Sequence, residues 1–267
     1  MNKSILITGS TDGIGKLAAM KMAKDGHHVF LHGRNPEKLK TVIEEVKQAT
    51  QNANIDGFVA DFSDMTQVKS MSDAINATVP HLDILINNAG IFKSSNPITN
   101  DGIDIRIAVN YYAPYLLTHN IIDKLKTSNE PRIINLSSAA QSTVSLELLN
   151  GDLTLPDQEA YAQSKLAILM WSLHLANQES SIAVNALNPG SLLNTNMVRE
   201  AYGKFWSPAD KGSNIIYDLA LVTSTEAMDG KYFDNDRGSF GPAHPDAYDT
   251  PMINTLMEHT ESIISRM

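Results

Sequence analysis

The 267-residue chain contains no cysteine. Disulfides, thiolate metal sites and cysteine nucleophiles are therefore excluded, and the composition fits a reducing compartment, for which the cytoplasm is the default expectation. Long apolar runs are also missing, and the N-terminus has neither a cationic leader nor a cleavage site, so we expect no membrane span and no signal peptide. The net charge of −9 argues against a nucleic-acid partner, because phosphate backbones attract clustered positive charge.

Repeats, low-complexity segments and a histidine spacing typical of metal ligands are missing as well, so we expect no metal. The overall composition is typical of a globular protein. Apolar residues make up 42% and charged residues 19%, which supports a core along the whole length. An α/β protein of this size often remains a single domain, and we expect one domain over residues 1–267.

Apolar, β-branched segments of strand length alternate with segments of helical periodicity. Strands are predicted at residues 5–8, 29–32, 57–61, 84–87, 133–136, 182–187 and 231–233. Helices are predicted at 13–25, 36–50, 65–79, 102–126, 159–178 and 208–222, and a further helix at 252–264 would close the domain. This alternation predicts an α/β fold: a Rossmann-type, doubly wound parallel sheet of about seven strands, with helices on both faces.

Chemically informative residues follow the carboxyl ends of five predicted strands: Gly9, Asp61, Asn88, Ser138 and Asn188. In a doubly wound sheet these ends meet at one edge, and ligands bind there, where the strand order reverses. The sequence therefore predicts one site to which all five residues belong.

The first of these turns is glycine-rich. Gly9, Gly13 and Gly15 permit a tight turn and a close approach of the backbone to a pyrophosphate. A helix that begins at Gly13 would present unpaired amides and the positive end of its dipole to the phosphates. Taken alone, the segment is as typical of a plain strand-to-helix turn as of a phosphate site.

Tyr161 and Lys165 are four residues apart in a predicted helix and so lie on one helix face. A free tyrosine is a poor base because its pKa is about 10, but a nearby cation favours the phenolate. The pair is therefore a candidate for proton transfer to and from a substrate.

Six motifs occur in a fixed order along the chain. They are Thr8–Gly15, Asn87–Gly90, Asn110, Asn135–Ser138, the pair Tyr161 and Lys165, and Asn188–Gly190. Over residues 4 to about 236 this order resembles the short-chain dehydrogenase/reductase family, and the chain is most similar to its retinol-dehydrogenase-like and WW-domain oxidoreductase-like members. The resemblance implies the strand order 3-2-1-4-5-6-7 and a nicotinamide cofactor.

The resemblance also implies roles for four residues. Tyr161 would protonate a carbonyl oxygen during reduction and accept the alcohol proton during oxidation. Lys165 would lower the pKa of Tyr161 and hydrogen-bond the nicotinamide ribose. Ser138 would donate a hydrogen bond to the substrate oxygen, with Ser137 as the competing candidate, and Asn110 would hold a water that links Lys165 to solvent.

The end of the second predicted strand bears on the choice of cofactor. An acidic residue there would hold the ribose hydroxyls, but the chain has Gly33 followed by Arg34, which can bind a 2′-phosphate. NADP(H) is therefore predicted over NAD(H), although Asp12 nearby favours the alternative. By resemblance, the cofactor site comprises Gly9, Thr11, Asp12, Gly13, Ile14, Gly15, Arg34, Asp61, Phe62, Asn88, Ala89, Gly90, Tyr161, Lys165, Pro189, Gly190, Leu192 and Thr195.

The nicotinamide end of this site departs from the family pattern. A threonine usually stands four residues beyond the glycine that corresponds to Gly190, whereas this chain has Asn194 there and Thr195 one position later. The sequence leaves open which of the two side chains holds the carboxamide.

Three segments border the predicted site. The loop at 139–158 is rich in leucine, which predicts either an apolar substrate wall or packing against the protein's own surface. Residues 191–210 contain an amphipathic patch that predicts either a lid or a core-facing helix. The tail at 237–267 begins as a loop that would flank the same mouth.

Together these features predict an oxidoreductase that interconverts a carbonyl and an alcohol on an apolar small molecule. A non-catalytic protein of the same fold, which senses the cofactor or scaffolds a complex, is the main alternative. A sugar-nucleotide epimerase would have a larger C-terminal region, and a divergent enoyl reductase a wider spacing of tyrosine and lysine. The helix with Tyr111, Tyr112 and Tyr115 forms a dimer interface in many relatives, which predicts a homodimer or homotetramer.

Overall fold

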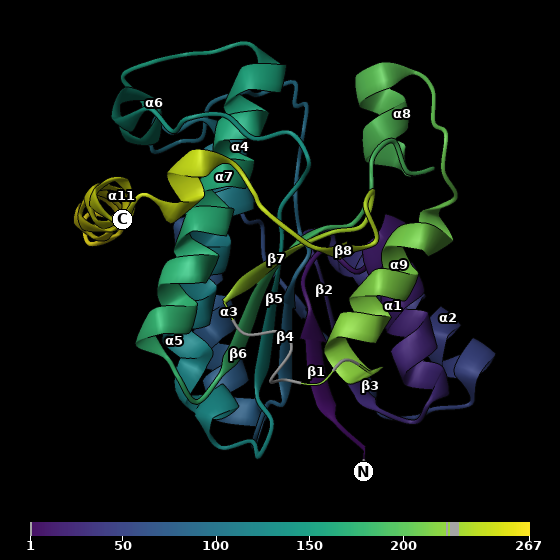
Figure 1. Cartoon of the computed structure of the whole chain (residues 1–267). Coiled ribbons are helices and arrows are strands. Elements are labelled where there is room, and N and C mark those ends of the chain that lie inside the picture. Colours follow the sequence, from purple (N-terminus) through teal and green to yellow (C-terminus); the bar gives the residue numbers. More distant parts are fainter. Residues whose placement is uncertain (1, 223, 225–229) are drawn as a thin grey trace.

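Eight strands form one sheet in the computed structural model, which describes residues 2–222, 224 and 230–267 (Figure 1). The strands are β1 (Ser4–Ile7), β2 (His28–Gly33), β3 (Ile55–Val59), β4 (Ile84–Asn87), β5 (Arg132–Leu136), β6 (Ala183–Asn188), β7 (Lys231–Asp234) and β8 (Ser239–Phe240). Their order is β3-β2-β1-β4-β5-β6-β7-β8, which confirms the predicted order of the first seven. Neighbours among β1 to β7 pair in parallel, and the two-residue β8 pairs antiparallel with β7. Such a short strand has no periodic pattern to reveal it.

Helices cover both faces of the sheet (Figure 1). One layer consists of α1 (Gly13–Lys24), α2 (Pro36–Thr50) and α9 (Ala209–Tyr217), and the other is built on α3 (Met65–Thr78), α5 (Ala113–Lys126) and α7 (Asp157–Gln178). Successive side chains of a strand point to opposite faces, so Ile5 and Ile7 enter the core under α1, whereas Leu6 enters the core under α5. Both faces are apolar, which explains the unbroken apolar runs in the sequence.

The predicted helix at 102–126 differs from the structure in its first half. It begins with the short α4 (Ile105–Ile107), widens into the π-helical turn η1 (Ala108–Tyr112) and continues as α5. Pro114 lies just after the widened turn and has no N–H to donate in the α-helical pattern. The predicted helix at 208–222 likewise ends in a π-helical turn, η2 (Asp218–Val222), and the third strand lies two residues earlier than predicted.

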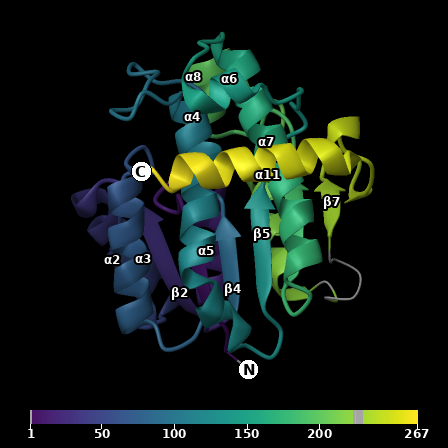
Figure 2. The same cartoon turned by 90° about the vertical axis from the view of Figure 1, so that its left-hand side faces the viewer.

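The C-terminal part covers one helical layer from outside. After η3 (Pro245–Tyr248), α11 (Thr250–Ile264) runs across the layer that contains α5 and α7 (Figure 2). The Tyr111 hydroxyl and Thr260 Oγ1 form a buried hydrogen bond of 2.6 Å beneath it. Tyr111 and Tyr112 are fully buried, so a dimer formed through this face would require α11 to leave it.

The described residues contain no helix with the length and apolar character needed to cross a bilayer. They also contain no group of three histidine or acidic side chains arranged to hold a metal ion.

Candidate active site

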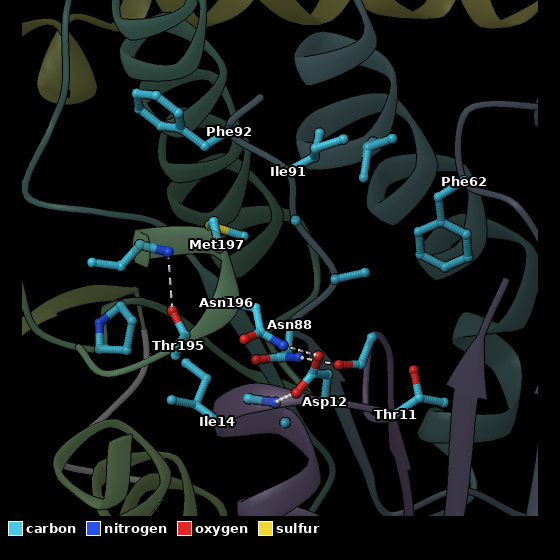
Figure 3. A pocket seen from close by; sticks show the side chains of 18 of the residues that line it. Thr11, Asp12, Ile14, Phe62, Asn88, Ile91, Phe92, Thr195, Asn196 and Met197 are labelled. Atoms are coloured by element: carbon cyan, nitrogen blue, oxygen red, sulfur yellow. Dashed lines mark hydrogen bonds between the residues drawn. The ribbon is translucent and has the colours of Figure 1, made fainter. Parts of the chain in front are cut away.

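A cavity of about 460 Å³ lies at the carboxyl ends of the strands, where the sequence predicts the site (Figure 3). It is lined by most of the predicted site residues: Gly9, Thr11, Asp12, Gly13, Ile14, Gly15, Arg34, Asp61, Phe62, Asn88, Ala89, Gly90, Ser138, Tyr161, Pro189, Gly190 and Thr195. Asn110, Lys165 and Leu192 do not line it. The cavity is thus continuous from the glycine-rich turn to the candidate acid.

Two glycines of the glycine-rich turn, Gly9 and Gly15, have no room for a side chain. Gly9 has a φ of 62°, and a Cβ there would lie 2.7 Å from the Cα of Ala89. At Gly15 a Cβ would lie 2.7 Å from the Gly9 carbonyl oxygen, and the Asn88 amide donates to that oxygen at 3.0 Å. The backbone is therefore bare on the cavity side.

Asp12 caps the helix that follows this turn. Its carboxylate accepts from the Gly13 amide at 2.7 Å, while Ile14 and Gly15 belong to the first turn of α1, whose amides have no intrahelical acceptor. The same carboxylate accepts from Asn196 at 2.8 Å, across the cavity (Figure 3), and from Lys38 at 3.3 Å. These contacts lower the pKa of Asp12 although partial burial raises it. Free amides, a helix dipole and a bare backbone fit a pyrophosphate.

A histidine that sequence reasoning missed supports this turn. His32 Nδ1 accepts from the Gly9 amide at 3.0 Å, and Nε2, which must then carry the proton, donates to the Ala60 carbonyl at 3.0 Å. The imidazole stacks on Phe62 with ring centroids 4.1 Å apart. Burial lowers the pKa of His32 to about 4, so the ring is neutral at pH 7. No sequence motif identifies this residue, because its partners come from the ends of two other strands, β1 and β3.

Where the sequence predicts the adenosine end of the cofactor site, the end of β2 has a cation and no carboxylate. Arg34 is exposed at the rim, and no described residue forms a hydrogen bond or ion pair with it. A Cβ at Gly33 would lie 2.5 Å from the Thr11 methyl group, so an acidic side chain there would require the Thr11 side chain to shift. Asp12, which argued for NAD(H), is already engaged by Lys38 and Asn196.

Tyr161 and Ser138 face the other end of the cavity from α7 and the end of β5. Burial raises the pKa of Tyr161 to about 12, and a hydrogen bond with the Ser138 hydroxyl opposes that rise. Ser137 is buried, and its hydroxyl donates to the Lys165 carbonyl at 2.7 Å. The structure thus gives Ser137 a packing contact and leaves Ser138 beside Tyr161.

Lys165 lies behind the cavity wall. Its ammonium donates to the Leu136 carbonyl at 2.7 Å and lies 5.7 Å from the centre of the Tyr161 ring. A Cβ at Gly90 would lie 3.5 Å from this ammonium and 3.3 Å from Asn110 Oδ1, so Gly90 stands between both groups and the cavity. Burial lowers the pKa of Lys165 to about 7.

The expectation that Lys165 lowers the pKa of Tyr161 stays a prediction, and the net pKa of Tyr161 lies above its ordinary value. Burial dominates both groups: it raises the pKa of the phenol and lowers that of the ammonium.

The fourth predicted catalytic residue is Asn110. Its side chain forms hydrogen bonds with the backbone of Ile91, at 2.8 and 3.0 Å, and with the Ser164 hydroxyl at 2.9 Å. It therefore fixes the loop after β4 to α7.

The two candidates for the carboxamide contact are separated by the structure. Thr195 lines the cavity, where it caps α8 (Asn196–Tyr202), whereas the Asn194 oxygen accepts from the Arg199 guanidinium at 2.5 and 3.0 Å. Leu192, with a φ of 49°, uses its carbonyl to accept from Trp206 at 3.0 Å. Thr195 rather than Asn194 is thus available to a ligand.

The loop at 188–191 is fastened by residues that follow β7. Asp236 accepts from the Ser191 amide at 3.0 Å and from the Ser191 hydroxyl at 2.5 Å, and the Asn235 amide donates to the Pro189 carbonyl at 2.8 Å. These contacts, which the sequence did not reveal, fix Pro189 and Gly190 at the cavity edge.

The lid prediction and its alternative are distinguished by burial. α8 has no buried residue, and Trp206 just beyond it is 73% exposed, so this segment does not face the core. Phe92 lies between the rings of Tyr161 and Tyr202, with centroid distances of 4.9 and 5.3 Å, and the Tyr202 hydroxyl donates to Gln158 at 3.1 Å. The segment therefore stands over the mouth of the cavity, close to Tyr161.

The leucine-rich loop packs on the protein itself. It contains α6 (Leu146–Asn150), in which Leu148 and Leu149 are fully buried, and the Tyr112 hydroxyl donates to the Leu149 carbonyl at 3.0 Å. No residue between 139 and 158 lines the cavity. Of the two predictions for this loop, the structure thus supports packing and not a substrate wall.

The short chain dehydrogenase family model matches residues 3–204 of the chain. Retinol dehydrogenase 13 of Mus musculus is 32% identical over 98% of this chain and 84% of the relative, and polyprenol dehydrogenase of Homo sapiens is 30% identical over 87% and 76%. A crystal structure from Escherichia coli, described as a short chain dehydrogenase complexed with NADPH, has a TM-score of 0.73 and 26% identity over 88% of this chain and 97% of its own. The chain therefore belongs to the short-chain dehydrogenase family, is an oxidoreductase with a site for a nicotinamide cofactor, and resembles the retinol dehydrogenases.

Proposed function

We propose that this protein is an NADP(H)-dependent oxidoreductase that interconverts a carbonyl and an alcohol on an apolar small molecule, with Tyr161 as acid and base. The carrying observation is the single continuous cavity: it has the bare glycine-rich turn and Arg34 at one end and Tyr161 beside Ser138 at the other. A bound nicotinamide cofactor supplies or accepts the hydride.

The protein's own groups handle the oxygen of the substrate. With a pKa near 12, Tyr161 is protonated at neutral pH and can donate its proton to the oxygen of a carbonyl. Ser138 can hold the same oxygen, and Lys165, behind Gly90, is within reach of a ribose placed against that glycine. Protonated Tyr161 is the form that reduction uses, and its phenolate is the form that oxidation uses.

The mouth of the cavity supports an apolar substrate. Five apolar side chains line this end: Ile91, Phe92, Val109, Met197 and Val198. Two charged side chains, Lys93 and Glu200, line it as well. The relatives named retinol dehydrogenase and polyprenol dehydrogenase carry the names of apolar alcohols.

The first experiment follows NADPH absorbance while the purified protein meets a panel of apolar ketones and aldehydes. We expect turnover in the parent and a loss of about 10²–10⁴-fold in Tyr161→Phe, because proton donation is removed while the ring stays. Cofactor affinity, measured by NADPH fluorescence, should be unchanged. Tight NADPH binding without turnover of any member would favour the cofactor-sensing alternative.

The choice of cofactor is tested with Arg34→Ala. Loss of a charge-assisted contact to the 2′-phosphate should lower kcat/KM for NADPH by about 10- to 100-fold and leave that for NADH nearly unchanged. Lys40→Ala, an exposed cation of the neighbouring helix, serves as the control for a general loss of positive charge. A parent enzyme that prefers NADH, with no response to Arg34→Ala, contradicts the assignment.

A further inference from the structure

His32 stands where the ends of three strands meet, and it contacts the glycine-rich turn more than once. Its backbone amide donates to Ser10 Oγ at 2.9 Å, its carbonyl accepts from the Ser10 amide at 2.9 Å, and its ring accepts from the Gly9 amide. One residue of β2 thus holds both the backbone and a side chain of the turn that follows β1.

The other side of the imidazole ring also has fixed partners. Nε2 donates to the Ala60 carbonyl at the end of β3, and the ring stacks on Phe62 two residues later. His32 is 3% exposed, so these contacts are made in a site from which water is largely excluded. An imidazole in one defined tautomer therefore spans the distance between the phosphate side and the adenosine side of the cavity.

Gly9 needs such a partner. Gly9 has a φ of 62°. Its carbonyl accepts a hydrogen bond from Asn88, which follows β4, and its amide donates one to His32, so the residue is fixed on both sides. Without an acceptor at the Nδ1 position, the partly buried amide of Gly9 loses its hydrogen bond, and the turn is held only by its remaining bonds to Asn88 and to the His32 backbone.

We infer that His32 is a positioning residue for the cofactor: it fixes the glycine-rich turn relative to the Phe62 wall and so sets the affinity for the dinucleotide. It acts through Gly9, Ala60 and Phe62 and takes no part in the chemistry at Tyr161. The inference rests on the proposed dinucleotide site, but the geometry of the turn can be tested without any ligand.

Two substitutions separate the two ends of the ring. His32→Asn keeps an acceptor at the Nδ1 position and loses the bond to Ala60, whereas His32→Gln keeps a polar group at the Nε2 position and loses the acceptor for Gly9. We expect His32→Gln to raise the Kd for NADPH by about 10-fold and His32→Asn by about 3-fold, the larger value being one lost, partly buried hydrogen bond. The kcat at saturating cofactor should stay within about 2-fold of the parent in both, as expected for lost ground-state binding.

Hydrogen exchange without cofactor supplies the independent readout. The peptide that contains Gly9 should exchange faster in His32→Gln than in His32→Asn or the parent, because only the first variant lacks the acceptor. His119→Asn, a substitution of a histidine that stacks on Tyr115 away from the cavity, controls for the loss of an imidazole. Equal exchange and equal Kd in the two His32 variants, with the same loss of Tm, would show that His32 only fills space and overturn the inference.

If the parent turned over no substrate, the proposed function would fail, and the exchange and NADPH-binding measurements would still decide the role of His32.

Discussion

The two ends of the cavity are built in different ways. At the cofactor end, the turn after β1 is held by His32, Asn88 and Asp12 through backbone and side-chain hydrogen bonds, and a Cβ on Gly9 or Gly15 would overlap its neighbours. At the other end, α8 has no buried residue, and its Tyr202 contacts α7 through Gln158. The first end is held by many hydrogen bonds and close backbone contacts, whereas the second is a surface cover whose side chains can vary without disturbing the core.

The largest effect is expected from a substitution in the glycine-rich turn. Gly9→Ala places a Cβ 2.7 Å from the Ala89 Cα and forces a non-glycine residue to a φ of 62°. We expect a loss of about 2–5 kcal/mol in the free energy of unfolding, from overlap and backbone strain together, with NADPH binding lost in what remains folded.

Gly238→Ala is the matched control for that substitution. Gly238 has a φ of 70°, and no atom lies within 4 Å of the place a Cβ would take, so only the strain of about 1–2 kcal/mol should appear in denaturant unfolding. Similar losses in the two variants would mean that close approach to Ala89 contributes little.

A second prediction concerns Lys165, the buried cation behind the cavity wall. Its pKa of about 7 lies below the ordinary 10.5, so between these pH values the unfolded chain binds a proton that the folded chain gives up, and folded stability rises with pH across that window. Lys165→Met lacks this titration. It should therefore be more stable than the parent at pH 7, by an amount that shrinks as the pH approaches 10, while turnover is lost.

Thermal unfolding of the parent and of Lys165→Met at several pH values measures this difference. The exposed Lys40→Met should show no pH-dependent change relative to the parent. A Lys165→Met protein less stable than the parent at pH 7 would indicate that the bond to the Leu136 carbonyl outweighs the cost of burial.

The smallest effect is expected at the cover. Tyr202→Phe removes an exposed hydrogen bond to Gln158, so the free energy of unfolding should change by less than about 0.5 kcal/mol. The KM for a carbonyl substrate should rise by about 2-fold, because the cover is tethered less firmly, and the Kd for NADPH should not change. Tyr248→Phe, which removes one exposed contact outside the lid, is the control.

An altered Kd for NADPH in Tyr202→Phe would mean that the two ends of the cavity are coupled. The bond between Asn196 of α8 and Asp12 of the glycine-rich turn is the contact through which such coupling would pass.

The cofactor end was largely predictable because its requirements are local. Gly9, Gly13 and Gly15 are needed wherever a backbone approaches a phosphate closely, and the spacing of Tyr161 and Lys165 follows from helix geometry. Asn110 and Lys165 were placed in the site by resemblance, yet the structure sets them behind Gly90.

What escaped prediction depends on contacts between distant segments. The hydrogen-bond partners of the His32 ring, Gly9 and Ala60, lie 23 and 28 residues away in the sequence. Asp236 accepts a hydrogen bond from Ser191, which lies 45 residues away. Phe92 is recognised as part of the mouth only when Tyr161 and Tyr202 are seen on either side of it.

The sequence by itself determined the α/β class and the edge at which the site lies, because periodicity, turn residues and crossover handedness are local or nearly universal constraints, and the order of the parallel strands came from the family resemblance. Only the tertiary structure decided that the leucine-rich loop packs inward, that Thr195 and not Asn194 faces the cavity, and that α11 covers the helical face expected to dimerise. In each case the sequence offers several apolar or polar partners of similar chemistry and does not indicate which of them will be in contact. Burial and hydrogen-bond geometry make that choice only when the whole chain has folded.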